Sequence, residues 1–239
     1  MIINALAVLF CLLAIYWFAF KEGFFSGVVH FACVLVSGAL AFAFWEPLAI
    51  AMLDSGMREW AWGMSLLGLF SVFLFVLRVV GNLAIPEKVN VPNVVDVVGG
   101  GVVGAGSGII TVGILMLGVG FLPVGTLGGK MGYVRDGAGQ PTRQGTLVPF
   151  ASMTEAFYAG VSRGAFAPMT NAGNLADSYP ALADQAWSLQ RDTDEKGRIE
   201  LTAAPADLKV GTPYFGTYGP GGEEYFVVPV TVNKSGFHR

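Results

Sequence analysis

Four long apolar runs dominate the first half of the chain, at residues 2–20, 24–45, 63–85 and 94–122. Each run approaches or exceeds the roughly 20 residues that a helix needs to cross the hydrocarbon core of a bilayer. Short segments that contain charged residues, proline or tryptophan separate the runs. The pattern therefore predicts a transmembrane domain of four helices within residues 1–124.

The first apolar run, Ile2 to Phe20, lacks the marks of a cleaved signal peptide. Such a peptide has a basic start, a shorter apolar core and a small-residue cleavage site, and none of these is found here. Bulky Leu9 and Phe10 precede Cys11, which argues against lipid attachment at that cysteine. We expect this run to stay as the first span, joined by a tight turn to the second in an antiparallel hairpin.

The second run is expected to end at Trp45-Glu46-Pro47, because a proline disfavours helical geometry in the residue before it. Trp45 would then lie in the aromatic belt at the membrane interface. The segment from Pro47 to Glu59 fits either a short surface helix or a plain loop. Arg78, towards the end of the third run, is expected to snorkel to the headgroups, with a place on an ion path as the alternative.

The fourth run follows Asn93, which we expect to cap its helix, and carries glycine at regular spacings. Glycines that recur every seven residues form one stripe, and glycines that recur every four form a second ridge on another face. Small residues let helix backbones approach closely in a bilayer. We therefore expect this helix in the middle of the bundle, although glycine is also simply common in spans. The stripe contains Gly99, Gly106, Gly113 and Gly120, and the ridge contains Gly100, Gly104 and Gly108.

Two glycine motifs superficially resemble nucleotide-binding loops. Gly99, Gly101 and Gly104 match G-x-G-x-x-G, but the acidic residue about 20 positions later and the polar crossover helix are missing. The segment 125–130 ends in a lysine that Met131 follows, so it lacks the Ser or Thr of a phosphate loop. Nucleotide binding is not expected.

Residues 125–166 read as a glycine-rich linker and an amphipathic helix. Phe150, Met153, Phe157 and Val161 share one helical face, with Thr154 elsewhere. This helix is expected either to lie on the membrane or to cap the bundle.

Residues 167–239 read as an extramembrane tail. A β-hairpin is predicted at about residues 212–232, where two strand-like segments flank Gly-Pro-Gly-Gly. Because an isolated hairpin is marginal in water, it is expected to pack on something, such as another protein.

Composition supports this fold class, an integral membrane all-α bundle with a small strand-containing tail. The 239 residues are 54% hydrophobic and 13% charged, with a mean hydropathy of +0.59, whereas soluble domains are about 25% charged. The net charge of −3 offers no basic field for nucleic acid. Cys11 and Cys33 lie in apolar runs, which favours packing roles over a disulfide.

Candidates for chemistry are few. His30, Glu46, Arg78 and Asp96 are the intramembrane or span-end polar residues that we single out. A lone histidine in a span is a functional candidate, yet a hydrogen bond to a neighbouring helix would satisfy it equally well. An enzyme needs convergent nucleophiles, acids or ligands, so we expect no catalytic residue, metal or cofactor.

Three segments resemble the colicin V production protein family, four-span proteins of the bacterial inner membrane. They are Lys21-Glu22-Gly23-Phe24-Phe25-Ser26-Gly27, Phe44-Trp45-Glu46-Pro47, and Asp96 with Gly99, Gly100, Gly104 and Gly108. The resemblance covers about residues 1–165, although the first turn is less basic here. It implies a multi-pass protein of the bacterial inner membrane, with the first and third loops cytoplasmic and the termini and tail periplasmic.

The function expected from these features is that of a non-enzymatic accessory or scaffold protein of the colicin V production type. It would pack with other membrane-protein subunits, or with itself, in a larger envelope or secretion-related complex. Its glycine faces, amphipathic helix and hairpin would supply the contacts. The alternative is transport of a small solute, ion or proton, which would need the span-end polar residues to face one path.

Overall fold

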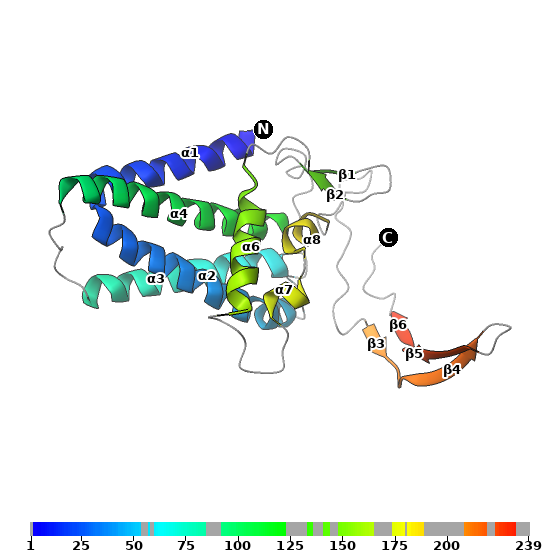
Figure 1. Ribbon diagram of the computed structural model, residues 1–239. Coiled ribbons are helices and arrows are strands. Elements are labelled where there is room, and N and C mark those ends of the chain that lie inside the picture. Colours follow the sequence, from blue (N-terminus) through cyan, green and yellow to red (C-terminus); the bar gives the residue numbers. More distant parts are fainter. Residues whose placement is uncertain are drawn as a thin grey trace.

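The computed structural model describes residues 2–53, 57, 60–84, 92–122, 133–135, 141–143, 148–164, 174–179, 181–188, 208–218 and 223–232. Most of this part is helical, and four helical segments are long and apolar enough to cross a membrane, as predicted (Figure 1). They are α1 (Ile2–Trp17) with the π-helix η1 (Phe18–Glu22), α2 (Phe24–Leu53), α3 (Ala61–Ala84) and α4 (Asn93–Gly120).

Helix α4 lies between its neighbours, and a larger share of it is buried than of the other three candidate spans. Helix α1 lies along one side of it, and α2 and α3 lie along the other (Figure 1). The start of α1 and the end of α4 are at the same end of the bundle. The opposite end holds the α1–α2 turn, the end of α3 and the start of α4.

The second helix does not end at Trp45-Glu46-Pro47, so that prediction was wrong. Helix α2 continues through Pro47 to Leu53, so residues 47–53 form neither a separate short helix nor a loop. Residues 54–56, 58 and 59 of the same predicted segment lie outside the described residues. Proline is tolerated inside a membrane-type helix where neighbouring helices and local adjustments satisfy the freed backbone groups. Helix α4 also departs from expectation at its start, because Pro92 takes the cap position and Asn93 is the first helical residue.

Trp45 is a core residue, contrary to the predicted place at the interface. Its side chain is 1% exposed. Its ring centroid lies 5.3 Å from that of Trp62, 5.2 Å from that of Phe121 and 5.4 Å from that of Tyr179. Trp45 therefore joins α2 to α3, to the end of α4 and to the tail.

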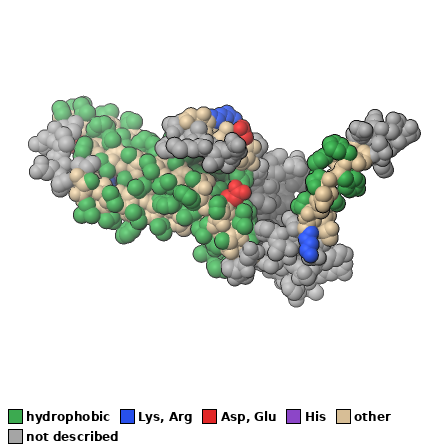
Figure 2. Space-filling model, turned by 90° about the horizontal axis from the view of Figure 1, so that it is seen from below, with side chains coloured by type: hydrophobic (Ala, Val, Ile, Leu, Met, Phe, Trp, Pro, Cys, Tyr) green, Lys and Arg blue, Asp and Glu red, His purple; other side chains and the backbone are tan. Residues whose placement is uncertain are grey.

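The outer surface of the bundle is apolar over a wide area. Figure 2 shows hydrophobic side chains covering much of the visible face of the four-helix part. Contiguous apolar surface on this scale is unusual in a soluble monomer, and it is the kind of surface that lipid tails cover. Exposed large side chains on two outer helices include Leu6, Leu9, Leu12 and Leu13 on α1 and Val72, Phe75, Val80 and Leu83 on α3.

Helix α6 (Phe150–Ser162) crosses the bundle near the end of α4, followed by the short helices α7 (Leu175–Ser178) and α8 (Leu182–Ser188) (Figure 1). Of the two placements predicted for the amphipathic helix, the structure shows the cap on the bundle. The predicted buried face was wrong in part. Thr154 and Tyr158 are buried, whereas Met153 is 43% and Phe157 is 36% exposed.

The strands form antiparallel pairs in the tail and in the preceding segment. Strand β1 (Tyr133–Arg135) pairs with β2 (Pro141–Arg143). The predicted hairpin is β4 (Tyr214–Tyr218) with β5 (Glu223–Val227), and the pair of β3 (Leu208–Val210) with β6 (Val230–Val232) extends it. We call residues 208–218 and 223–232 the aromatic ribbon, because Phe215 lies opposite Phe226 at its middle.

Candidate functional site

Polar side chains gather at the end of the bundle where the α1–α2 turn meets the end of α3 and the start of α4. We call these side chains, together with the glycine of the turn, the turn-end cluster; it consists of Glu22, Ser26, His30, Arg78 and Asp96 with Gly23. It contains three of the four polar residues singled out from the sequence. The fourth, Glu46, lies 16 residues from His30 along α2, which is about 24 Å of helix. Glu46 therefore lies at a different level of the bundle from the other three.

Asp96 anchors the start of α4 to the α1–α2 turn. Its Oδ1 accepts a hydrogen bond of 2.7 Å from the backbone N–H of Phe24, one of the N–H groups that the first turn of α2 leaves without an intrahelical partner. Gly23 makes the approach possible, because it has φ of 84° and a Cβ there would lie 2.7 and 2.8 Å from the Asp96 carboxylate oxygens. Asp96 acts here as a cap supplied by another helix.

Arg78 extends to the α1–α2 turn, where it has a protein partner. Its Nη2 donates to Ser26 Oγ at 3.2 Å. Ser26 Oγ in turn donates to Glu22 Oε2 at 2.9 Å. This relay joins α3, α2 and η1, and the predicted snorkelling of Arg78 stays a prediction.

His30 packs against an aromatic ring of the first span. Its ring stacks on Phe18, with centroids 5.0 Å apart and planes 27° apart. Phe18 begins the π-helix η1, so the stack holds the wide turn of η1 against α2.

The ridge of Gly100, Gly104 and Gly108 faces α1. A Cβ at Gly104 would lie 2.9 Å from the carbonyl oxygen of Ala14 and 3.0 Å from the Cα of Ile15. Gly108 lies against the Cα of Cys11, and Gly100 lies against the carbonyl group of Phe18. The two helices therefore touch backbone to backbone, which larger residues would prevent.

The stripe of glycines at seven-residue spacing faces two other elements. A Cβ at Gly99 would meet the ring of Phe24, and one at Gly106 would lie 3.0 Å from the ring of Phe31, both on α2. Gly113 lies instead against the Thr154 side chain and the Phe150 carbonyl of α6. Both glycine faces are thus covered within the chain.

The residues that seat α6 were missed by sequence reasoning. The Tyr158 hydroxyl donates to the carbonyl of Leu35 at 3.1 Å, and Gly38 leaves the space for its ring. Thr154 Oγ1 lies 3.4 Å from the carbonyl oxygen of Ile109. The available signal was the spacing of Phe150, Thr154 and Tyr158 at every fourth position, which a search for apolar residues alone overlooks.

Glu155 ties α6 to the tail. Its Oε1 and Oε2 accept hydrogen bonds of 2.9 and 3.0 Å from the backbone N–H groups of Leu182 and Ala183. These donors belong to the first turn of α8, where a carboxylate satisfies otherwise orphaned N–H groups. At the same end of the bundle, burial together with the charge and hydrogen bond of Glu46 raises the pKa of Tyr179 to about 12.

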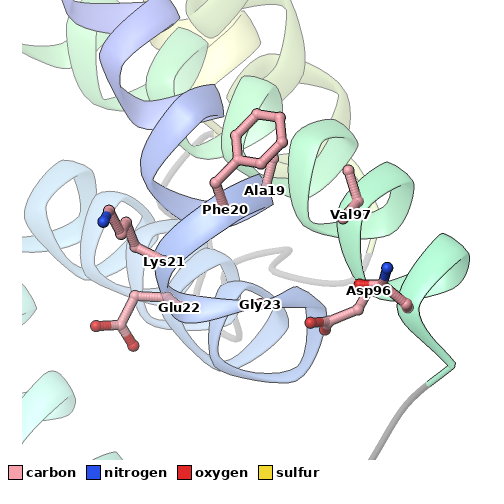
Figure 3. Close-up of a pocket in the computed structure, with 8 residues that line it drawn as sticks. Ala19, Phe20, Lys21, Glu22, Gly23, Asp96 and Val97 are labelled. Atoms are coloured by element: carbon pink, nitrogen blue, oxygen red, sulfur yellow. The ribbon is translucent and has the colours of Figure 1, made fainter.

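A recess of about 340 Å³ lies beside the turn-end cluster, between the end of η1 and the start of α4. Figure 3 shows the Asp96 carboxylate extending from α4 towards Gly23, while Lys21 and Glu22 extend from the end of η1. Phe20 and Val97 lie further along the two helices. Among the residues that the structure describes, no group of three or more His, Cys, Asp or Glu side chains could hold a metal ion.

Fold and site together define a mostly helical chain with four apolar helices that are long enough to cross a membrane, which is the organisation of a multi-pass membrane protein. Comparison with protein-family models, curated proteins and solved structures finds no match. The resemblance to the colicin V production family therefore stays a prediction.

Proposed function

We propose that this chain is a non-enzymatic accessory protein of the bacterial inner membrane, of the colicin V production type. In this proposal the four-helix bundle is an anchor, and the aromatic ribbon binds an extended segment of another membrane-protein subunit. The observation that carries the proposal is the exposed aromatic surface of the ribbon. In this proposal the tail, and therefore this contact, lies on the periplasmic side, as the resemblance stated above implies.

The ribbon exposes large apolar side chains around one aromatic pair. Phe215 is 76% and Phe226 is 62% exposed, and their rings meet edge to face with centroids 5.4 Å apart. Tyr214 and Tyr225 are also exposed. Figure 2 shows this separate group of hydrophobic side chains apart from the bundle. Aromatic residues in such positions dominate the binding energy of protein interfaces.

The backbone of the ribbon favours an extended partner. In the described part of the chain, β4 and β5 form a sheet of only two strands, so each has an outer edge to which a further strand can add. Residues 208–232 contain one basic residue, Lys209, and two acidic ones, Glu223 and Glu224. This balance gives little attraction to an anionic lipid surface, which favours a protein as the occupant.

The bundle offers less support for transport. Both glycine faces of α4 are used to seat α1, α2 and α6, and Ser26 and Arg78 are hydrogen-bonded within the turn-end cluster. His30 and Glu46 are about 24 Å apart along one helix. Ser26, Arg78 and His30 each contact a neighbouring element within the chain, which favours a structural role for these groups.

Site-specific photocrosslinking in cells tests the proposal. A photoreactive amino acid at Phe226 is expected to give one discrete adduct with another membrane protein, whereas the same group at Phe75, which is 71% exposed on α3, is expected to react with lipid. The double variant Phe215→Ser/Phe226→Ser should abolish stable association of that protein. Met153→Ser/Phe157→Ser, which removes the same number of exposed apolar side chains from α6, should retain it. Association that survives the ribbon variant would overturn the proposal.

A further inference from the structure

Helix α6 reverses the usual arrangement of polar and apolar side chains. The side that it buries against the bundle includes Thr154 and Tyr158, whose hydroxyl groups meet backbone carbonyls of α4 and α2. A helix that covers a soluble protein instead turns its polar residues outward. The exposed residues of α6, which we call its outer face, are apolar or lack a side chain: Met153, Ala156, Phe157 and Gly160. Polar groups inside and apolar groups outside are typical of a helix that lipid surrounds.

The contacts of α6 lie along the spans and not beyond their ends. Asp96 and the Phe24 N–H that it binds mark the polar level of the turn-end cluster. The carbonyl of Leu35, which accepts a hydrogen bond from Tyr158, lies 11 positions after Phe24, or about 17 Å of helix. Gly113, which α6 covers, lies 17 positions after Asp96, or about 26 Å of helix. Both distances are shorter than a hydrocarbon core of about 30 Å, so α6 is docked at the depth of lipid tails.

The direction of α6 suits the plane of a membrane. Figure 1 shows it running across α4 and α2, whereas the four candidate spans run along the bundle. Its 13 residues make about 20 Å of helix, which is too short to cross the core. The end of α4, from which the chain comes, and the helices α7 and α8, to which it leads, lie at the same end of the bundle. Helix α6 can therefore lie within one leaflet.

The charges on and beside α6 are compatible with this depth. Within α6, all of whose residues are described, Glu155 is the one charged residue. Both of its carboxylate oxygens accept hydrogen bonds from the start of α8. Arg163 follows the last helical residue and is exposed, and a long arginine side chain can carry its charge to the headgroups. Glu155 is thus paired within the chain, and Arg163 can reach the lipid surface.

We propose that α6 is embedded in one leaflet of the bilayer and that its outer face contacts lipid acyl chains. The face is open, because a Cβ at Gly160 would meet nothing within 4 Å. The hydroxyl groups of Thr154 and Tyr158 turn to backbone carbonyls because hydrocarbon offers them no water. In the proposed orientation this is the periplasmic leaflet, where α6 fixes the start of the tail against the bundle.

This inference goes beyond the partner role of the ribbon, but it rests on membrane insertion, one element of the proposed function. Phe75, which is 71% exposed on α3, reports insertion separately. Lys209, which is exposed on the ribbon, reports water. If position 75 is found in water, the membrane placement itself fails. If position 75 lies in lipid while the outer face lies in water, only the placement of α6 is overturned.

The experiment places a nitroxide on introduced cysteines of the full chain in phosphatidylcholine vesicles, with Cys11 and Cys33 changed to alanine. Collisions with oxygen, which concentrates in lipid, are compared with collisions with a water-soluble nickel chelate. At Met153→Cys and Phe157→Cys we expect oxygen collisions to dominate, as at Phe75→Cys. At Lys209→Cys we expect nickel collisions to dominate.

Two results of this comparison would overturn the proposal. One is a nickel collision rate at positions 153 and 157 equal to that at position 209, which would place the outer face in water. The other is exclusion of both reagents from positions 153 and 157, which would mark a contact with protein, such as a second copy of this chain.

A pair of substitutions at one position gives an independent test. Phe157→Glu would put a carboxylate among acyl chains, so the protection of α6 amides against hydrogen exchange in the same vesicles should fall by about tenfold. Phe157→Leu keeps the position apolar and should leave that protection unchanged. Equal protection in the two variants would contradict the lipid contact, because a face in water accepts a carboxylate at little cost.

Discussion

At the scale of single residues, the molecule depends on positions where a side chain is absent or where a carboxylate caps another helix. Gly23 lets Asp96 reach the start of α2, and Gly104 lets α1 touch α4. Glu155 holds the start of α8 in the same way that Asp96 holds the start of α2. Each of these contacts joins elements that are distant in sequence.

Gly104 provides a direct test of backbone contact between α1 and α4. We expect Gly104→Ala to lower the free energy of unfolding by about 1–3 kcal/mol, the usual cost of forcing extra atoms into a packed site. Gly68 is the control, because a Cβ there meets nothing within 4 Å, and its change to alanine should be neutral or stabilising by up to about 1 kcal/mol. Reversible unfolding in mixed micelles gives both values. An equal effect of the two substitutions would contradict the contact.

The raised pKa of Tyr179 predicts that the tail loses stability at high pH. Burial, and then the charge and hydrogen bond of Glu46, raise the pKa of Tyr179 from 10.0 to about 12. A folded-state pKa above the unfolded one means that the neutral phenol contributes its stability in full below pH 10, and that this is lost as the pH rises from about 10 towards 12. Tyrosinate absorbance should include a group that titrates near pH 12, which Tyr179→Phe removes and Glu46→Gln moves to lower pH. A titration unchanged by both variants would contradict this placement.

At the scale of elements, α4 organises the bundle and α6 closes it. The two glycine faces of α4 lie against α1 on one side and against α2 and α6 on the other. Helix α6 uses Thr154 and Tyr158 for its contact with the bundle, because their hydroxyl groups find backbone carbonyls where Gly113 and Gly38 leave room. Its more apolar residues, Met153 and Phe157, remain exposed.

The face that α6 buries is open to a substitution test. Thr154→Leu should force α6 away from Gly113, so the protection of α6 amides against hydrogen exchange should fall by about tenfold, or about 1.4 kcal/mol. Phe157→Ser, on the exposed face, should leave that protection unchanged. The amides of α4 should stay protected in both variants. If Phe157→Ser instead caused the loss, the predicted apolar face would be the docking face after all.

Sequence reasoning predicted some of these elements well and others poorly, for physical reasons. Four apolar helices and a strand-containing tail follow from run length and turn residues, which are local properties. The end of α2 was misplaced because neighbouring helices, which local sequence does not reveal, allow the helix to pass Pro47. The turn-end cluster could be named only in part, since the contacts of Asp96 with Phe24 and of Arg78 with Ser26 span 72 and 52 positions.

At the scale of the whole molecule, the two ends of the bundle have different characters. One end holds the turn-end cluster and the recess, and the other holds the start of α1, the end of α4 and the helices α6 to α8. The aromatic ribbon follows from this second end. In the proposed membrane placement, four spans would put these two sets on opposite sides of the bilayer, so the turn-end cluster and the partner site on the ribbon would be separated by the membrane.

Labelling of introduced cysteines tests this arrangement. In a background in which Cys11 and Cys33 are alanine, an impermeant thiol reagent should label Lys21→Cys from the cytoplasmic side only and Asp177→Cys from the periplasmic side only. Labelling of both from one side would contradict an even number of spans. The reverse assignment would contradict the orientation implied by the family resemblance while leaving the bundle intact.

The central claim is that the bundle anchors a ribbon that binds another membrane subunit, and the mass of the extracted particle tests it most directly. After extraction in mild detergent, native mass spectrometry of the full chain should give a particle whose mass is not a whole-number multiple of 25.2 kDa. The particle should contain a second polypeptide in a fixed ratio to this chain. The Phe215→Ser/Phe226→Ser protein should lack that polypeptide. A particle that contains this chain alone, as a monomer or a homo-oligomer, would contradict the claim.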